Sequence, residues 1–555
     1  MAARLCWPPH SVDETDASRA SVGVALVSIA LACVLAYGPM LAQFFTGTDT
    51  ITLIETSRIT NVQDIRRIVA EPLMAGSDFL QVARFYRPLS TISYSIDYWL
   101  WGVHPAGFHF TNLLLHTLTC MFIFLMMRAS FGLGLFPAGL GTITFALHPI
   151  LVETVPSIDR RHDIIAALFI VLCVIFCAKY LASRYHDRRY LWASVACEVA
   201  AMASKETAFF LPALLLVFIG LFVRAEAGLT RIRTILRMWL PYAISAFLYM
   251  VWRMYVLGGV GGYTSTRHGS WAEKERYVGQ MAASYLYDLL SPIDSMWQPV
   301  LTTTLSIALL GAALALLPLA SEYMGSRKIE LALQTDKRPL YKIRIFLLCW
   351  LFMPLAVFAF TLTFGHRGMY IPTIALSCLI ALNFQAVSRR VQGAHARGNA
   401  KPAYWDARRL LAALSKTAAV AASVVVVCLM IRYSPLVCNY GAWQASAQLS
   451  SHLLRQFLIS ASILPDKSCV VVNQAPDSLE NASDGSPQPK EVAFPQGYSF
   501  SSWLKLYLPS SHARVILGKR SRAKYFSGFV RFSNYLWTKK TLVVFVSMGR
   551  PHKTR

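Results

Sequence analysis

Charged side chains are scarce in this chain of 555 residues. Asp, Glu, Lys and Arg make up 15% of the sequence, and hydrophobic residues make up 55%. In a soluble domain about a quarter of the residues are charged. The mean hydropathy is +0.45. Because so little charge excludes an ordinary soluble domain, the composition predicts a protein that spans a membrane several times.

Acidic residues are the scarcer charged type. The sequence has 29 Asp and Glu against 53 Lys and Arg, which gives a formal net charge of +24. Such an excess can indicate a nucleic-acid partner. Here the basic residues gather in alternate loops between apolar runs, near 179–189, 224–237, 327–344 and 389–409. The positive-inside rule places these loops in the cytoplasm. The charge therefore predicts topology and contact with the lipid bilayer, with no nucleic acid as partner.

Two further absences limit the function. We find no tandem repeat of about 34 residues, which excludes a repeat array after the membrane body. The eleven cysteines show no Cys/His spacing typical of a metal site. We therefore assign no metal ligands and require no cofactor, although a divalent metal is compatible with the chemistry below. Most cysteines fall in apolar runs, as small buried residues do, while Cys438 and Cys469 could form a disulfide.

Apolar runs long enough to cross a hydrocarbon core of about 30 Å recur along the chain. We predict about eleven such spans, at 21–44, 108–127, 134–152, 163–183, 189–204, 206–223, 237–257, 299–321, 344–365, 370–388 and 417–434. The amino-terminal tail 1–20 is then cytoplasmic, and the membrane body covers 21–434. The first run is too long for the core of a signal peptide, so we expect it to be retained.

Two segments are predicted outside the membrane. The long outer loop 45–106 contains a surface helix that Asn61 can cap and that has apolar residues along one face. Residues 435–555 contain short apolar runs typical of buried strands, at 469–472, 513–517 and 541–548. The predicted fold class is an α-helical multi-pass membrane protein with a small extracytoplasmic α/β domain at its carboxyl end. A bacterial inner membrane, or its equivalent, would hold it.

Asp49 lies just beyond the first predicted span. A carboxylate at that place can act as a general base toward an acceptor hydroxyl. The alternative interpretation is a helix cap, a position that Asp favours. Glu55, further along the same segment, can equally lie on a solvated face.

The outer segment around Tyr86 carries guanidinium groups at the membrane boundary. Arg84 and Arg87 flank Tyr86, and the forked donors of Arg match the oxygens of phosphate. The alternative is lipid-headgroup anchoring or a salt bridge from Arg87 to Asp97. Both interpretations remain open from the sequence.

Polar residues also occupy the next spans and the loops that follow them. In the second span one helix face carries, at spacings of i, i+3 and i+7, His109, Asn112 and His116. They can line a polar cavity or satisfy one another inside the bundle. Another set joins the third and fourth spans: His148, Glu153, Asp159, Arg160, Arg161, His162 and Asp163. Two more follow later spans: Lys205 with Glu206, and His366 with Arg367 and Tyr370. Since ionisable groups at membrane depth are costly and usually mark a working site, their convergence on one side predicts an active site at the outer surface.

Taken together, these motifs resemble those of the GT-C glycosyltransferases. The matching stretches are YRPLS (86–90), LWGVHPAGFHFTNLLLH (100–116), FALHPILVETV (145–155), RRHD (160–163), SKE (204–206) and HRGMYIP (366–372). They are most similar to the protein O-mannosyltransferase-like enzymes, many of which carry tetratricopeptide repeats. The resemblance covers residues 25–390, with the motifs in the family's order.

The resemblance implies a GT-C membrane fold and an inverting transfer of a sugar, mannose in the most similar enzymes. The donor would be a polyprenyl-phosphate sugar, and the acceptor a hydroxyl of a protein, lipid or glycan. Asp49 matches the catalytic carboxylate. Four cations would hold the donor phosphate: Arg87, Arg161, Lys205 and Arg367. The remaining outer residues would support the pocket: Glu55, Tyr86, His109, Asn112, His116, His148, Glu153, Asp163, Glu206 and Tyr370.

The chain departs from the family pattern at two positions. It has one acid, in Thr48-Asp49-Thr50, where the family usually has two, and His366 where the family commonly has Glu. Two other functions stay as alternatives. A transporter or flippase of a lipid-linked glycan would place its charges on broken helices at mid-bilayer. A non-catalytic membrane scaffold would follow if Asp49 is only a cap.

Overall fold

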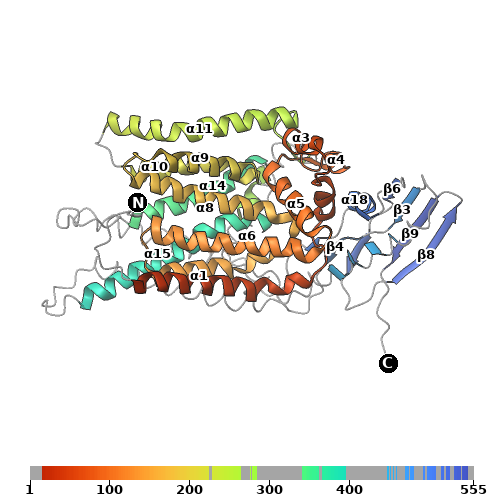
Figure 1. The fold of residues 1–555 in the computed structure, drawn as a ribbon, viewed down its shortest axis with the longest axis horizontal. Helices are drawn as coiled ribbons and strands as arrows, with labels where there is room; N and C mark the ends of the chain where they lie inside the picture. The colour runs from red at the N-terminus through yellow and green to blue at the C-terminus, as the bar shows by residue number, and fades with distance from the viewer. Residues whose placement is uncertain are drawn as a thin grey trace, which may run out of the picture.

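Long helices lie side by side in the body of the protein (Figure 1). The computed structural model describes residues 16–223, 228–263, 340–361 and 366–395, with shorter pieces between 275 and 285 and between 447 and 547. The helices of the body are α1 (Asp16–Tyr37), α6 (Pro105–Leu125), α7 (Leu135–Ala146), α8 (Arg161–Ala182), α9 (Arg188–Met202), α10 (Leu211–Phe222), α11 (Leu229–Leu257), α14 (Leu340–Thr361) and α15 (Tyr370–His395).

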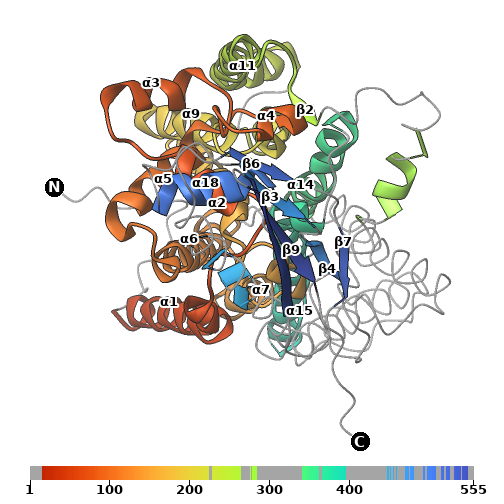
Figure 2. The same ribbon diagram turned by 90° about the vertical axis from the view of Figure 1, so that its right-hand side faces the viewer.

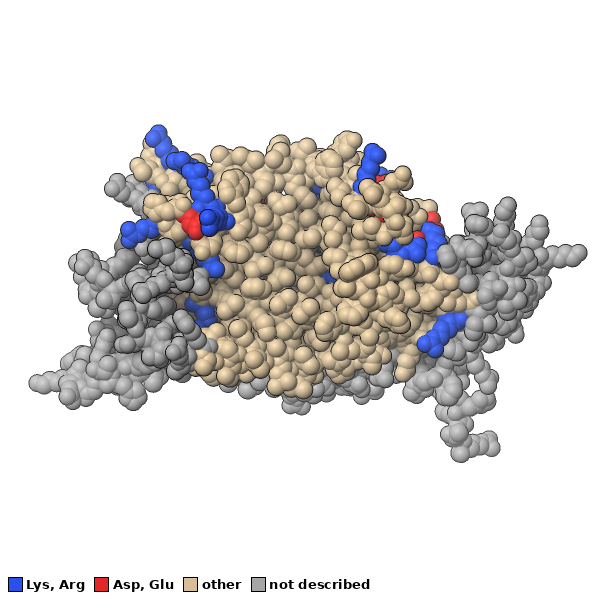
Figure 3. Space-filling view, viewed as in Figure 1, with Lys and Arg blue, Asp and Glu red and all other residues tan. Residues whose placement is uncertain are grey.

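Five described helical segments are long and apolar enough to cross a membrane: Ala20–Ala42, Pro105–Ser130, Ile158–Ala182, Leu229–Leu257 and Leu340–Phe360. A helix satisfies its backbone hydrogen bonds internally, as a lipid environment requires. On the face that Figure 3 shows, the described Lys and Arg side chains gather toward the two ends, with a broad, almost uncharged surface between them. The predicted α-helical multi-pass class is confirmed. The predicted spans 299–321 and 417–434 lie outside the described residues, so the number eleven stays a prediction.

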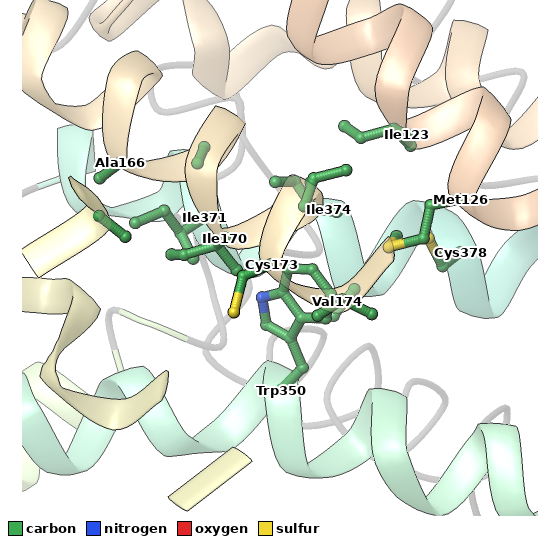
Figure 4. Packing of buried hydrophobic residues seen from close by; sticks show 14 of the residues in the cluster. Ile123, Met126, Ala166, Ile170, Cys173, Val174, Trp350, Ile371, Ile374 and Cys378 are labelled. Carbon is green, nitrogen blue, oxygen red and sulfur yellow. The ribbon is translucent and has the colours of Figure 1, made fainter. Parts of the chain in front are cut away.

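Helix α8 forms the centre of the bundle, since most of its residues are buried. Figure 4 shows Cys173 and Val174 of α8 in one cluster with Trp350 of α14 and Ile374 of α15. Because lipid tails are as apolar as these side chains, close packing rather than removal from water holds such helices together. Among the described cysteines, six are buried and Cys349 is half-buried, as expected for small residues within spans.

The predicted span 134–152 is wrong in its extent. Helix α7 ends at Ala146, and the chain continues as two 3₁₀ turns, η3 (Pro149–Glu153) and η4 (Ile158–Arg160). Pro149 has no N–H and disfavours a helical conformation in the residue before it. His148 reinforces the turn, because its Nδ1 accepts a hydrogen bond from the N–H of Ile150 at 3.3 Å.

Short elements cover one end of the bundle, which we call the outer end because it carries the predicted outer loop (Figure 1). They are η1 (Gly38–Ala42), α2 (Thr50–Thr56), α3 (Val62–Ala70), α4 (Phe79–Val82), β1 (Ala83–Arg84) and α5 (Pro88–Trp101). Strand β1 pairs antiparallel with β2 (Gly262–Tyr263), which follows α11. This pairing joins the outer loop 45–106 to the segment that follows α11.

Helix α3 is the surface helix that the sequence predicts. The Asn61 side chain accepts the N–H of Asp64 at 3.1 Å, and the Asp64 carboxylate accepts the N–H of Asn61 at 3.1 Å. This reciprocal pair is a capping box. Val62 and Ile65 are exposed, whereas Ile68 is buried against the layer below.

The described part of the carboxyl-terminal region contains strands and the helix α18 (Gly497–Tyr507). Strand β3 (Cys469–Asn473) lies between β6 (Arg514–Leu517) and β9 (Thr541–Ser547) in parallel, and β8 (Arg531–Thr538) pairs antiparallel with β9. A second sheet has the order β5 (Val492–Ala493), β4 (Pro476–Glu480), β7 (Ser521–Lys524). The three apolar runs predicted as strands are therefore β3, β6 and β9. Helix α18 packs on α2, which places this region at the outer end (Figure 2). Of the possible Cys438–Cys469 disulfide, Cys438 lies outside the described residues.

Candidate active site

The loop that carries Asp49 joins η1 to α2 at the outer end. Asp49 occupies the N-cap position of α2, but its side chain makes no capping hydrogen bond to that helix. The backbone N–H of Asp49 and the hydroxyl of Thr48 both donate to Asp159 Oδ2, each at 3.4 Å. Thr46 fixes the start of the loop by donating to the carbonyl of Pro156 at 3.0 Å. Asp49 is half-buried, and these contacts hold its loop through the Asp49 backbone and the side chains of Thr46 and Thr48.

Asp159 is a second carboxylate at this loop. It is 1% exposed, and it accepts a hydrogen bond from Ser157 Oγ at 2.5 Å. Gly47 has a φ of +99°, and a Cβ there would lie 2.5 Å from Asp159 Oδ1. Only glycine allows this backbone so close to the carboxylate. The sequence grouped Asp159 with the polar residues that follow the third span but gave it no role, although the missing second acid beside Asp49 was a signal that another carboxylate could take part.

Arg87 stands at the amino-terminal end of α5 in a buried ion pair. Its Nη2 lies 2.7 Å and its Nε 3.0 Å from Glu206 Oε2, and Glu206 begins the turn η5 (Glu206–Phe210). Its Nη1 is 3.3 Å from His162 Nε2 at the start of α8. The guanidinium also lies 4.4 Å from the ring centre of Phe85. Since Arg87 pairs with Glu206, the predicted alternative of a salt bridge to Asp97 is wrong.

The pair of Arg87 and Glu206 belongs to a larger group that we call the outer ion cluster. Its members are Arg87, His162, Asp163, Lys205, Glu206 and Arg253. Lys205 Nζ pairs with Asp163 Oδ1, and Arg253 lies 3.9 Å from Glu206. Burial lowers the pKa of Lys205, and the charge of Asp163 opposes that shift. Basic side chains (Arg87, Lys205 and Arg253) outnumber the two carboxylates in this cluster, so the outer end is rich in positive charge.

Arg161 is the first residue of α8, next to His162 and Asp163 of the outer ion cluster. Its side chain is fully buried. Its Nη2 is 2.6 Å from Asp97 Oδ2, and its Nε donates to Asn112 Oδ1 at 2.7 Å. It also donates to the carbonyls of Phe108 and Ser93. These partners tie α8 to α5 and α6. The guanidinium is therefore committed to the protein, in contrast to the phosphate-binding role that the sequence suggested.

The polar side chains on one face of α6 contact separate segments of the chain, from the outer end into the helix bundle. His109 Nε2 is 3.3 Å from the carbonyl of Phe44, and Asn112 Nδ2 donates to the carbonyls of Val155 and Ser157. His116 Nδ1 lies 2.7 Å from the hydroxyl of Tyr370. The three residues thus contact three different segments, an arrangement that neither of the two interpretations of this face had foreseen.

Tyr86 and Glu55 connect the outer layer to its neighbours. The Tyr86 hydroxyl donates to the carbonyl of Val69 at 2.6 Å and accepts from Trp252 Nε1 at 2.9 Å. Burial raises the pKa of Tyr86. Glu55 accepts from Ser502 Oγ at 3.4 Å and lies 3.9 Å from Lys505, so α18 covers it. The predicted solvated face of Glu55 is therefore covered by the carboxyl-terminal region.

Two predicted site residues have side chains outside the described part of the structure. Glu153 ends η3, and Arg367 lies in η7 (His366–Met369). The two turns pack against each other. Their backbones therefore place both residues in one region of the bundle end.

A metal site requires several ligand atoms around one point. Among the residues that the structure describes, three His, Cys or carboxylate side chains converge only at Cys33, His116 and Cys120, inside the helix bundle. His116 and Cys120 are spaced i, i+4 and share a helix face. The sequence already contains this i, i+4 pair, which the prediction of no metal ligands did not take into account.

The fold and the site define a membrane protein with carboxylates and cations gathered at one end of a helix bundle, and its motifs resemble those of the GT-C glycosyltransferases. No protein-family model matches the chain. The chain is 32% identical over 131 residues to protein O-mannosyl-transferase Tmtc1 of Drosophila melanogaster, covering 22% of this chain and 14% of that protein. It is 36% identical over 126 residues to protein O-mannosyl-transferase TMTC2 of Homo sapiens, covering 22% and 15%. The resemblance to these enzymes is confirmed, over a small part of their length.

Among solved structures, the chain aligns with two of ArnT from Cupriavidus metallidurans. In the apo state the TM-score is 0.41 at 13% identity, over 90% of this chain and 86% of ArnT. With undecaprenyl phosphate bound, the TM-score is 0.38 at 13% identity, over 90% of both chains.

Proposed function

We propose that this protein is a glycosyltransferase that moves a sugar from a polyprenyl-phosphate donor to an acceptor hydroxyl on the outer face of the membrane that the chain spans. One observation carries the proposal. Asp49 and Asp159, 110 residues apart in the sequence, meet at the outer end, where the outer ion cluster is rich in positive charge. Mannose is the sugar that the names of the relatives Tmtc1 and TMTC2 give, so we propose mannose first.

Asp49 is the proposed general base. As the acceptor oxygen attacks the anomeric carbon, its proton passes to the Asp49 carboxylate. The new bond joins the acceptor oxygen to that carbon, and the bond from the carbon to the phosphate oxygen breaks. The electron pair of the broken bond leaves with the lipid phosphate. Because the acceptor attacks from the face opposite to that bond, the configuration at the anomeric carbon inverts. Asp159 holds the Asp49 loop in place through the contacts of Thr48 and the Asp49 N–H.

Arg87 and Lys205 are the proposed phosphate-binding residues. Both are largely buried and fixed by carboxylates, so they need little rearrangement when negative charge develops on the leaving phosphate. Arg161 is left out of this set because its side chain is fully buried, whereas those of Arg87 and Lys205 are 10% and 12% exposed. Arg367 stays in the set from the sequence, through its place in η7.

The carboxyl-terminal region supports a role next to the acceptor. Ser499 Oγ of α18 donates to the carbonyl of Thr48 at 2.9 Å, directly beside Asp49. The Trp503 ring of α18 makes edge contacts with the rings of Phe44 and Phe45. Trp503 and Leu454 belong to one buried apolar cluster. We propose that α18 forms one wall of the path by which the acceptor hydroxyl reaches Asp49.

The test is transfer by Asp49→Asn in proteoliposomes supplied with radiolabelled polyprenyl-phosphate mannose and a hydroxyl acceptor. Loss of a general base should lower kcat by about 10²–10⁴-fold. Asp78→Asn, an exposed acid in the same outer loop, is the matched control. Undiminished transfer by Asp49→Asn would overturn the assigned base. Label that crosses the bilayer without forming product would support a transporter instead.

A second arm tests donor binding. Arg87→Gln should raise the KM for the donor, whereas Arg66→Gln, on the exposed side of α3, should not. An unchanged donor KM in Arg87→Gln would count against the phosphate assignment. Activity that disappears with EDTA and returns with Mg²⁺ would show a divalent-metal requirement.

A further inference from the structure

A soft ligand set lies inside the bundle, apart from the proposed reaction. Cys33 of α1 and His116 and Cys120 of α6 are each fully buried. Their ligand atoms all lie within 4.8 Å of one another, and Cys120 Sγ is 3.7 Å from His116 Nε2. Thiolates and imidazole together are ligands that Cu(I) and Zn(II) prefer.

The spacing fits a shared ion. For a metal–sulfur distance of about 2.3 Å and a metal–nitrogen distance of about 2.0 Å, trigonal ligands would stand roughly 3.7 Å apart for S and N and roughly 4.0 Å for two sulfurs. The observed 3.7 Å between Cys120 Sγ and His116 Nε2 matches the first value. The remaining separations need a contraction of less than about 1 Å, which a side-chain rotation provides.

Neighbouring side chains also orient His116 for metal binding. His116 Nδ1 faces the hydroxyl of Tyr370 at 2.7 Å. When Nδ1–H donates to that oxygen, Nε2 directs its lone pair at the sulfurs, as metal-binding histidines do. The rings of Tyr37, Phe145 and Tyr370 pack around the imidazole. These three rings surround His116 by packing, and we assign none of them as a fourth metal ligand.

We propose that Cys33, His116 and Cys120 bind a single Cu(I) ion that clamps α1 to α6. Structural zinc takes four ligands in almost every case, whereas three soft ligands in a closed site suit monovalent copper. Cysteine binds a metal as its thiolate, so Cu⁺ displaces the protons of both thiols and the occupied site carries a net charge of −1. Helix α1 leads directly to the Asp49 loop, so the ion would fix the helix from which that loop starts.

The experiment measures metal content and needs no enzyme activity. The full chain in lipid nanodiscs is loaded with Cu⁺ under ascorbate or with Zn²⁺, freed of loose metal with a chelator, and analysed by mass spectrometry of metals. We expect one copper per chain in the native protein and in Cys378→Ser, a fully buried control in α15. Copper affinity should fall at least about 10-fold in Cys33→Ser and Cys120→Ser, and by about 10–100-fold in Tyr370→Phe.

Three results would overturn the proposal. If Cys33→Ser and Cys378→Ser bound the same number of copper ions per chain, Cys33 would not be a copper ligand and the proposed site would be wrong. A disulfide between Cys33 and Cys120 in the native protein would occupy both sulfurs. One zinc per chain, lost in the same variants, would replace the copper assignment. If the cysteine variants fail to fold, X-ray absorption of the copper-loaded native chain decides, because two sulfurs and one nitrogen must surround the copper.

Discussion

Replacing Arg161 with methionine separates the arginines that hold the fold from those that face the donor. The side chain is fully buried and makes an ion pair with Asp97 and hydrogen bonds with Asn112 and two backbone carbonyls. Asp97 is itself 1% exposed. Removing one partner of a buried ion pair costs about 3–5 kcal/mol, because the other charge remains buried without compensation. We therefore expect Arg161→Met to be among the most destabilising substitutions at the outer end.

The assay is thermal unfolding of the purified chain in detergent, followed by intrinsic fluorescence. For a chain of this size 1 kcal/mol corresponds to roughly 1 °C, so the loss corresponds to a fall in Tm of about 3–5 °C. Arg66→Met removes the same charge from an exposed site and should leave Tm almost unchanged. Asp97→Asn combined with Arg161→Met should recover part of the loss, since the orphaned charge is gone.

The pH dependence gives an independent check. Burial raises the pKa of Asp97, although the charge of Arg161 opposes the shift. A carboxyl with a raised folded pKa stabilises the fold at low pH and loses that contribution as pH rises through the folded pKa. Without Arg161 the pKa rises further. The stability of Arg161→Met should therefore recover more than that of the native chain as pH falls from about 8 to about 5.

The reasoning would be refuted if Arg161→Met melted like Arg66→Met and lost affinity for the donor. That outcome would return Arg161 to the phosphate site that the sequence first suggested.

Three further predictions concern the outer end. Trp503→Ala should cost about 3–5 kcal/mol and release α18, seen as faster proteolysis of the carboxyl-terminal region, whereas unchanged proteolysis would contradict the docking. Gly47→Ala should abolish transfer, because its Cβ would meet Asp159; full activity would exclude the observed loop geometry. Asn61→Ala should cost about 1 kcal/mol and speed amide exchange within α3. Hydrogen bonds from Thr60 hold the pKa of Asp64 below its usual value, so the capping contribution persists above the usual pKa and is lost as pH falls through the lowered one. Equal protection factors for the α3 amides at neutral and strongly acidic pH would contradict this pH dependence of the cap.

The sequence determined most of the long helices that the structure describes. Apolar runs of sufficient length must form helices in lipid, because the backbone finds no other hydrogen-bond partners there. Local chemistry was equally readable: Asn61 caps α3, and Pro149 limits α7. The motifs from Tyr86 to Tyr370 also indicated the resemblance to the O-mannosyltransferase-like enzymes, and the outer polar sets pointed to one end of the bundle.

Only the tertiary structure decided which charges meet. Arg87 pairs with Glu206 and Arg161 with Asp97, although the sequence offered the pairing of Arg87 with Asp97 just as readily. Asp159 reaches the loop of Asp49, and α18 covers that loop, across 110 and more residues of chain. Cys33 likewise meets His116 and Cys120 from another helix. Such partners depend on how helices pack, and a spacing along the chain determines contacts within one helix, not between two.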